Sequence, residues 1–163
     1  MASTSTNKQP LLVDNVLHVA IDLNQHKVAA NSATPGVVGG ANTAAKLLDC
    51  IGRDGAVIES MYTISRDTTE YKVNLYLATS GDYLRPEQSV FIGQITSATT
   101  AYTKSYVDDL PPVLAPVAHT GDEPQLRALY VPRGAALWAG VEVADINPVQ
   151  AKAPIIGIQG GNY

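Results

Sequence analysis

Three polar residues near the N-terminus have a spacing that could hold a metal ion. On a helix, His18, Asp22 and His26 would share one face, and imidazole and carboxylate groups are zinc ligands. The surrounding segment, 16–23, alternates apolar and polar residues, which is typical of a half-buried strand. In a strand His18 and Asp22 only share the solvent face. We therefore expect neither a metal ion nor another cofactor at these residues.

The remaining reactive residues lack the patterns that catalysis requires. His119 lies near Asp122 and Glu123, but no G-x-S-x-G nucleophile elbow occurs in the chain, and neither does the histidine motif of metal-binding cupin barrels. The single cysteine, Cys50, lies in no activating sequence, which favours a buried structural thiol. The sequence therefore predicts a protein that is not an enzyme.

Two acidic pairs and two glycine-rich segments could bind ions or phosphate. The pairs Asp108-Asp109 and Asp122-Glu123 lack the loop spacing that calcium sites need, so we expect them in solvated loops. The segments PGVVGG and GIQGGNY are not followed by Lys-Ser/Thr and do not join a strand to a helix, as a phosphate loop would. We expect a flexible loop and a flexible tail there.

Charge is unusually sparse in this chain. Charged residues make up 16% of the sequence, whereas the apolar share, 45%, is ordinary. Since the centres of protein interfaces are depleted of charge, this composition favours a subunit of an assembly over the alternative, a monomer with a neutral polar surface. The net charge of −4 and the absence of Lys and Arg clusters argue against nucleic-acid binding.

The 163 residues predict one domain with a polar extension. Residues 1–10 hold almost nothing to bury, so we expect a flexible N-terminal arm ahead of a domain at 11–163. The chain shows no signal peptide and no apolar run long enough to span a membrane, so we expect synthesis in a host cytoplasm and no membrane partner.

Short segments of β-forming residues, separated by Gly, Pro, Asp and Asn, predict a mainly β fold. Hairpins are expected around Asp54-Gly55, between 58–64 and 71–78, and between 128–131 and 135–143. Further strands are expected at 89–95 and 99–107, and a last short apolar strand in APIIGIQGGNY ahead of the glycine-rich tail. A short helical segment is expected at 43–49, and a proline-rich edge or covering loop at 111–119. Together these elements indicate an antiparallel β-sandwich or jelly roll.

Aromatic and basic residues are the best candidates for contacts with a partner. Trp138 lies opposite the apolar row of its strand, so it either faces a partner or fills the core. The turn SGDYLRPE carries Tyr83 and Arg85, the arm carries Lys8, and Tyr163 ends the tail.

The stretches LYLATSGDYLRPEQSVFIG and VPRGAALWAGVEV, with the polar arm and the glycine-rich tail, resemble the small β-sandwich virion proteins of tailed bacteriophages, particularly capsid decoration (cement) proteins. The resemblance extends over most of the chain and carries over no residue by position. It implies a non-enzymatic subunit, often trimeric, that stabilises the lattice of major capsid proteins on the virion surface, frequently through an N-terminal arm. A tail, neck or baseplate component and a carbohydrate-binding module are the alternatives.

Overall fold

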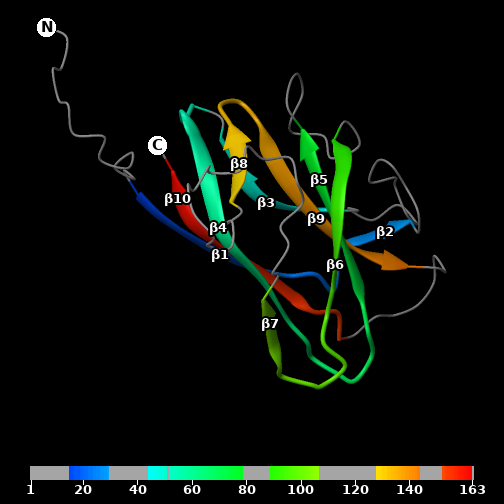
Figure 1. Ribbon diagram of the computed structural model, residues 1–163. Coiled ribbons are helices and arrows are strands. Elements are labelled where there is room, and N and C mark those ends of the chain that lie inside the picture. Colours follow the sequence, from blue (N-terminus) through cyan, green and yellow to red (C-terminus); the bar gives the residue numbers. More distant parts are fainter. Residues whose placement is uncertain are drawn as a thin grey trace, which may run out of the picture.

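The computed structural model describes residues 15–29, 44–50, 52–78, 89–106, 128–143 and 152–162. In this part of the chain the regular structure consists of ten strands, which form two sheets packed face to face (Figure 1). No helix among these residues could cross a membrane. The predicted arm at 1–10 and the boundary of the domain at 11–163 lie outside the described residues.

Sheet A contains both the first and the last strand of the described chain. Its order is β1, β10, β4 and β7, and β8 pairs with the other end of β4. All of these pairings are antiparallel. The strands are β1 (Asn15–Asp22), β10 (Ile155–Asn162), β4 (Gly55–Ile64), β7 (Lys104–Tyr106) and β8 (Leu129–Pro132).

Sheet B packs against sheet A and is built around β9. Its order is β2, β9, β5 and β6, and β3 also pairs with β9. These pairings are antiparallel except for the short parallel contact between β2 and β9. The strands are β2 (Lys27–Ala29), β9 (Ala136–Val143), β5 (Lys72–Ala78), β6 (Val90–Thr96) and β3 (Ala45–Asp49).

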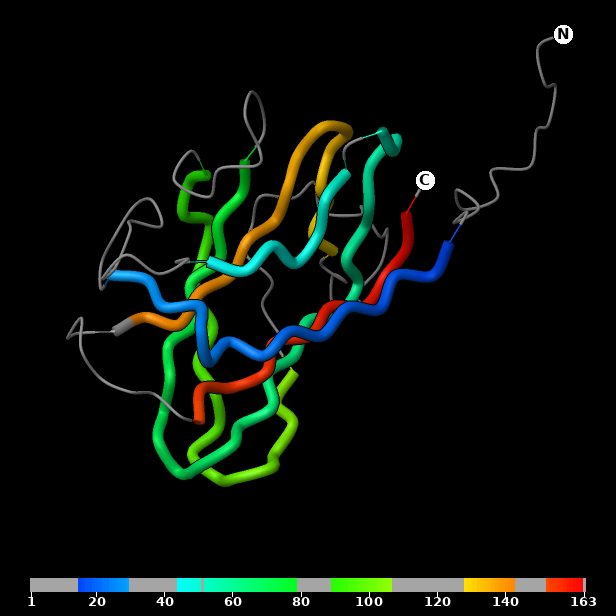
Figure 2. Tube along the Cα trace, turned by 180° about the vertical axis from the view of Figure 1, so that it is seen from behind, coloured from blue at the N-terminus to red at the C-terminus, as the bar shows by residue number. Residues whose placement is uncertain are grey.

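The order of pairing is that of a jelly roll. The first strand, β1, pairs with the last, β10, and the two run side by side along their length (Figure 2). Moving inward along the chain, β3 pairs with β9, β4 with β7, and β5 with β6. This is the pattern of one long hairpin wrapped into two sheets. The predicted mainly β, jelly-roll-like sandwich is therefore confirmed.

The hydrophobic core lies between the inner faces of the two sheets. Because side chains alternate along a strand, every second residue of each strand points inward. On β9 the inner row includes Leu137, Ala139 and Val141, the apolar row opposite Trp138. Burial of each large apolar side chain contributes about 1.5–3 kcal/mol. The largest core side chains include Leu23, Ile58, Met61, Leu75, Leu129, Leu137, Ile156 and Ile158.

Three predicted hairpins are instead connections between the sheets. The turn at Asp54-Gly55 joins β3 in sheet B to β4 in sheet A, and the turn after Pro132 joins β8 in sheet A to β9 in sheet B. The strands expected at 58–64 and 71–78 are present as parts of β4 and β5, but they lie in different sheets and do not form a hairpin. The two turns meet at Cys50, whose backbone bonds to Gly134 and Ala135. The turn residues determine only that the chain reverses direction. Whether the strands on either side of a turn pair with each other or join different sheets depends on how they are buried against the core.

Two further predictions of local structure were wrong. The helical segment expected at 43–49 contains β3, in which Ala45, Leu47 and Leu48 are buried against β9. Pairing with β9 therefore overrides a weak helical preference. The expected glycine-rich tail belongs to β10, where Gly160, Gly161 and Asn162 pair with both neighbouring strands.

Gly160 is required by the close approach of two backbones. It follows an irregularity in the β10–β4 pairing, and a Cβ at this position would overlap the carbonyl oxygen of Val57. Backbone atoms in the middle of a sheet cannot move aside without breaking their hydrogen bonds. The glycine therefore permits β4 and β10 to pair along their whole length.

We expect Gly160→Ala to lower the free energy of unfolding by about 3 kcal/mol, because the added methyl group overpacks a site bounded by backbone. The matched control is Gly52→Ala, where no atom lies within 4 Å of the added Cβ but φ is +71°. The control should cost about 1 kcal/mol, the penalty of a left-handed conformation. Urea denaturation of both variants measures the difference, and equal midpoints would contradict this role of Gly160.

Candidate functional site

Trp138 is buried, as the core alternative predicted, but it lies outside the main core. Its side chain is 7% exposed and lies on the face of sheet B that points away from the main core, in a small apolar cluster with Val28, Ala44, Tyr76 and Ala136. The ammonium of Lys46 lies 5.8 Å from the centre of its ring. Trp138 therefore offers little of its surface to a partner.

The other predicted contact residues and several weighed for chemistry lie outside the described residues. These are Lys8, Tyr83, Arg85 and Tyr163 among the predicted contacts, and His119, Asp108, Asp109, Asp122 and Glu123 among the candidates for catalysis or calcium binding.

The three residues with zinc-like spacing contact different partners. His18 is in β1, where its Nε2 lies 2.9 Å from the hydroxyl of Tyr62. Asp22, at the end of β1, binds Arg66, and His26 lies in the turn before β2. Within the described part of the chain, no group of three or more His, Cys, Asp or Glu side chains could hold a metal ion.

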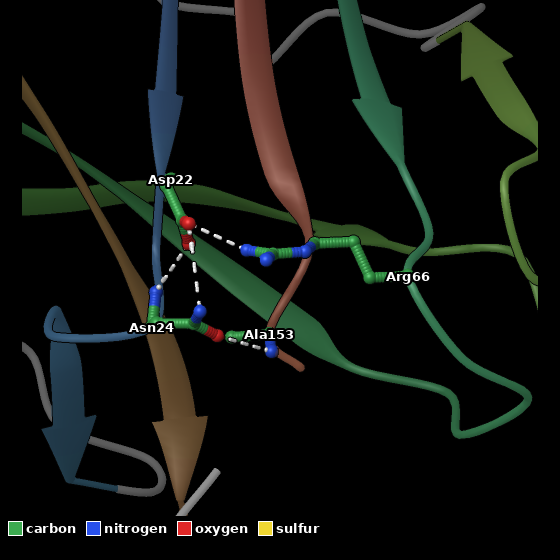
Figure 3. A network of polar contacts seen from close by, with 4 residues as sticks. All are labelled: Asp22, Asn24, Arg66 and Ala153. Carbon is green, nitrogen blue, oxygen red and sulfur yellow. Dashed lines mark hydrogen bonds and ion pairs between the residues drawn. The ribbon is translucent and has the colours of Figure 1, made fainter. Parts of the chain in front are cut away.

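Asp22 belongs to a polar network that joins three segments of the sandwich (Figure 3). Its carboxylate accepts a hydrogen bond from Arg66, which precedes β5, and from the backbone and side-chain nitrogens of Asn24. The side-chain oxygen of Asn24 accepts a 2.7 Å hydrogen bond from the backbone N–H of Ala153, just before β10. The network therefore holds connecting segments in place, which is a structural role.

His26 is partly buried, and this changes its protonation. Burial lowers its pKa from the ordinary histidine value, because the charged imidazolium loses hydration, and the nearby carboxylate of Asp22 opposes this shift. Its Nδ1 is buried and has no hydrogen-bond partner in the described structure. The folded protein therefore favours neutral His26.

Cys50 is fully buried, as predicted for a structural thiol. Burial raises the pKa of this thiol, and Asp49 adds to the shift, whereas Arg53 opposes it. Since the thiolate is the nucleophilic form, the raised pKa lowers the reactivity of Cys50.

The outer face of sheet A, which points away from the core, carries the candidate site. Strand alternation places His18 and Ala20 of β1, Tyr62 of β4 and Tyr106 of β7 on this face, and the register aligns Ala20, Gly157, Tyr62 and Tyr106 in one row across four strands. We call His18, Tyr62, Lys104 and Tyr106 the Tyr62 cluster. It unites strands that are far apart in the sequence.

The ring of Tyr62 is the centre of the cluster and is only 4% exposed. It lies over Gly157 so closely that a Cβ there would overlap the ring. The Tyr106 ring meets it edge-on, with 6.1 Å between ring centres. The ammonium of Lys104 lies 3.8 Å from the centre of the Tyr62 ring and 4.7 Å from that of Tyr106. Together these contacts hold the ammonium against both aromatic rings.

The outer face of sheet B is different, because its central side chains are buried. Tyr76 and Asn74 are almost inaccessible, and Asn74 donates a hydrogen bond to the Tyr76 hydroxyl and accepts one from Gln94. Burial raises the pKa of Tyr76; the charge of Glu142 raises it further, and the bond from Asn74 opposes the shift. Sheet A therefore presents the more open of the two outer faces.

Sequence reasoning missed the Tyr62 cluster. Lys104 and Tyr106 lie in the predicted Tyr- and Thr-rich strand, and their spacing of two already indicated a common face. No local signal places Tyr62 beside them or His18 beside Tyr62, because these contacts depend on the order of strands in the sheet.

Comparisons of the chain with protein-family models, with curated proteins and with solved structures found no match. The chemistry of the site therefore has to be argued from its own residues.

We expect Gly157→Ala to destabilise the protein by about 2 kcal/mol, because the added methyl group displaces the ring of Tyr62. Tyr62→Ala removes the obstructing ring, so the double variant should be more stable than the sum of the two single effects by about 1 kcal/mol. Urea denaturation of the four proteins in this cycle measures the coupling. Additive effects would show that the two residues are not in contact.

The free energy of unfolding should decrease as the pH falls from about 7.5 to about 5.5, because unfolded His26 takes up a proton that folded His26 resists. The contribution is present above the ordinary histidine pKa of about 6.5 and is lost as the pH falls below it. His26→Gln should flatten this part of the profile, measured by urea denaturation at several pH values. An unchanged slope would show that another group is responsible.

Proposed function

We propose that the protein is a non-enzymatic structural subunit that packs the outer face of sheet A against other protein surfaces. More specifically, we propose a virion protein that binds and stabilises the assembled capsid of a tailed phage as a decoration protein. The observation that supports this most directly is the outer face of sheet A, where large apolar and aromatic side chains of β1, β7 and β8 are exposed.

The exposed fractions make this face unusual for a surface. Val16 is 88% exposed, Tyr106 58% and Tyr130 45%, although all three lie in strands of this sheet. Tyr102, which precedes β7, is 85% exposed and has a φ of 60°, a conformation uncommon for a residue other than glycine. Exposed aromatic side chains with few charges around them are typical of protein interfaces.

The fold adds weaker support. Jelly rolls form viral capsid proteins, lectins and cupins, so the architecture agrees with a virion protein without specifying one. The low overall charge also agrees with a subunit that is covered in an assembly, as a homotrimer or another homo-oligomer on the capsid lattice.

The two alternatives differ in their support. A tail, neck or baseplate component would use the same packing chemistry and would join rings or tubes instead of capsids. A carbohydrate-binding module was inferred from exposed aromatic residues that included Trp138, but that ring is buried. In a carbohydrate-binding module the tyrosines of sheet A would have to stack on the sugar in place of Trp138.

The test is co-sedimentation of the purified protein with empty heads assembled from the major capsid protein of a neighbouring gene. We expect binding, and we expect Tyr106→Ser combined with Tyr130→Ser to weaken it at least about tenfold, as loss of two interface aromatics does. The matched control is Phe91→Ser, because Phe91 is 40% exposed on β6 of sheet B and should leave binding unchanged.

Failure of the wild-type protein to bind heads would overturn the capsid assignment, and incorporation into tail structures would favour the first alternative. Deletion of residues 1–10 tests the predicted arm separately. Unchanged binding after this deletion would show that the arm has no part in attachment.

A further inference from the structure

We propose that the Tyr62 cluster is a binding site for a carboxylate side chain of a protein partner, with Lys104 as its ion-pair donor. The inference rests on the proposed function, since it names the chemistry of the surface that docks on sheet A. The ligand class is an exposed Glu or Asp with apolar residues around it.

Within the described part of the chain, Lys104 is held by aromatic rings and not by a carboxylate. Its ammonium contacts the rings of Tyr62 and Tyr106, and among the described residues no carboxylate lies within salt-bridge distance of it. An ammonium group has three donors, and an aromatic ring attracts the charge without replacing a carboxylate acceptor. Because the rings already restrict the side chain, an incoming carboxylate would meet a partly preorganised cation.

The surroundings of Lys104 favour an anion over a cation. Asp22, at the far edge of the same face, is already paired with Arg66. His18 lies on the other side of the Tyr62 ring, with its Nε2 2.9 Å from the tyrosine hydroxyl. The net charge of −4 opposes an approaching carboxylate at long range, so the local charge of Lys104 has to supply the attraction.

The shape and composition of the face favour a protein surface over a sugar. Beside the exposed Lys104 and Tyr106 lie Ala20, which is exposed, and Ile64, which is partly exposed, so the accessible groups around the cation are small or apolar. Such a surface suits the apolar residues that flank a carboxylate in a protein interface. Binding sites for small ligands are concave and carry several directed polar groups. The exposed ring of Tyr106 would cover the stem of the bound side chain and reduce its contact with water.

The experiment is a chemical-shift titration of the full-length, ¹⁵N-labelled protein with the blocked peptide acetyl-Ala-Glu-Ala-amide. Its neutral match, acetyl-Ala-Gln-Ala-amide, and the acidic sugar galacturonate are titrated in parallel. We expect the glutamate peptide to shift amide signals of β1, β4 and β7 saturably, and the glutamine peptide to leave them unchanged. Lys104→Gln should weaken binding of the glutamate peptide about fivefold, the size of one partly exposed ion pair.

Lys72→Gln is the matched control, because Lys72 is exposed on β5 of sheet B and should leave the titration unchanged. Equal loss in both variants would overturn the proposal, because it would show attraction to overall charge alone. Absence of saturable shifts with the glutamate peptide would also overturn it, and so would shifts of these signals by galacturonate alone, which would identify a site for acidic sugars.

The same variants distinguish this inference from the proposed function. If heads bind the wild-type protein and Lys104→Gln equally well, the carboxylate site is refuted while capsid binding stands. If the peptide binds as expected and heads do not, the site is supported and the partner lies elsewhere.

Discussion

The antiparallel pairing of β10 with β1 on one side and with β4 on the other is the interaction on which the rest of the structure depends. It brings the two ends of the described chain into one sheet and supplies Ile156 and Ile158 to the core. Two glycines permit it: Gly160 lets the backbones of β4 and β10 approach, and Gly157 leaves room for the ring of Tyr62. The same strand therefore supports the core on its inner side and the candidate site on its outer side.

The two outer faces of the sandwich differ in how far their aromatic side chains are buried. On sheet B the central residues Tyr76, Asn74 and Trp138 are buried, and Phe91 at the edge strand β6 is exposed. On sheet A, Tyr106 remains exposed, and its ring helps to hold the ammonium of Lys104. Burial of this face by a partner would remove apolar surface from water and desolvate few charges, which is the favourable balance for association.

The candidate site could be predicted from the sequence only in part. The alternation of β1 correctly predicted a strand with His18 and Asp22 on its outward face. The aromatic residue chosen as an anchor, Trp138, is buried, because alternation distinguishes the two faces of a strand but does not show which face is covered. His18 and Tyr62 are in contact although they lie 44 positions apart in the sequence. A local sequence pattern cannot predict a contact over such a separation.

The sequence by itself determined most of the strands, several of their inward rows and their turns, because the alternation of apolar residues and the backbone preferences of Gly, Pro and Asp act over a few residues. Only the tertiary structure decided which strands pair. It made sheet connections of the turns at Asp54-Gly55 and after Pro132, and it made a strand of the segment at Ala45–Asp49. The reason is physical: a turn fixes only the direction of the chain, whereas pairing is settled by burial of both sheets against one shared core.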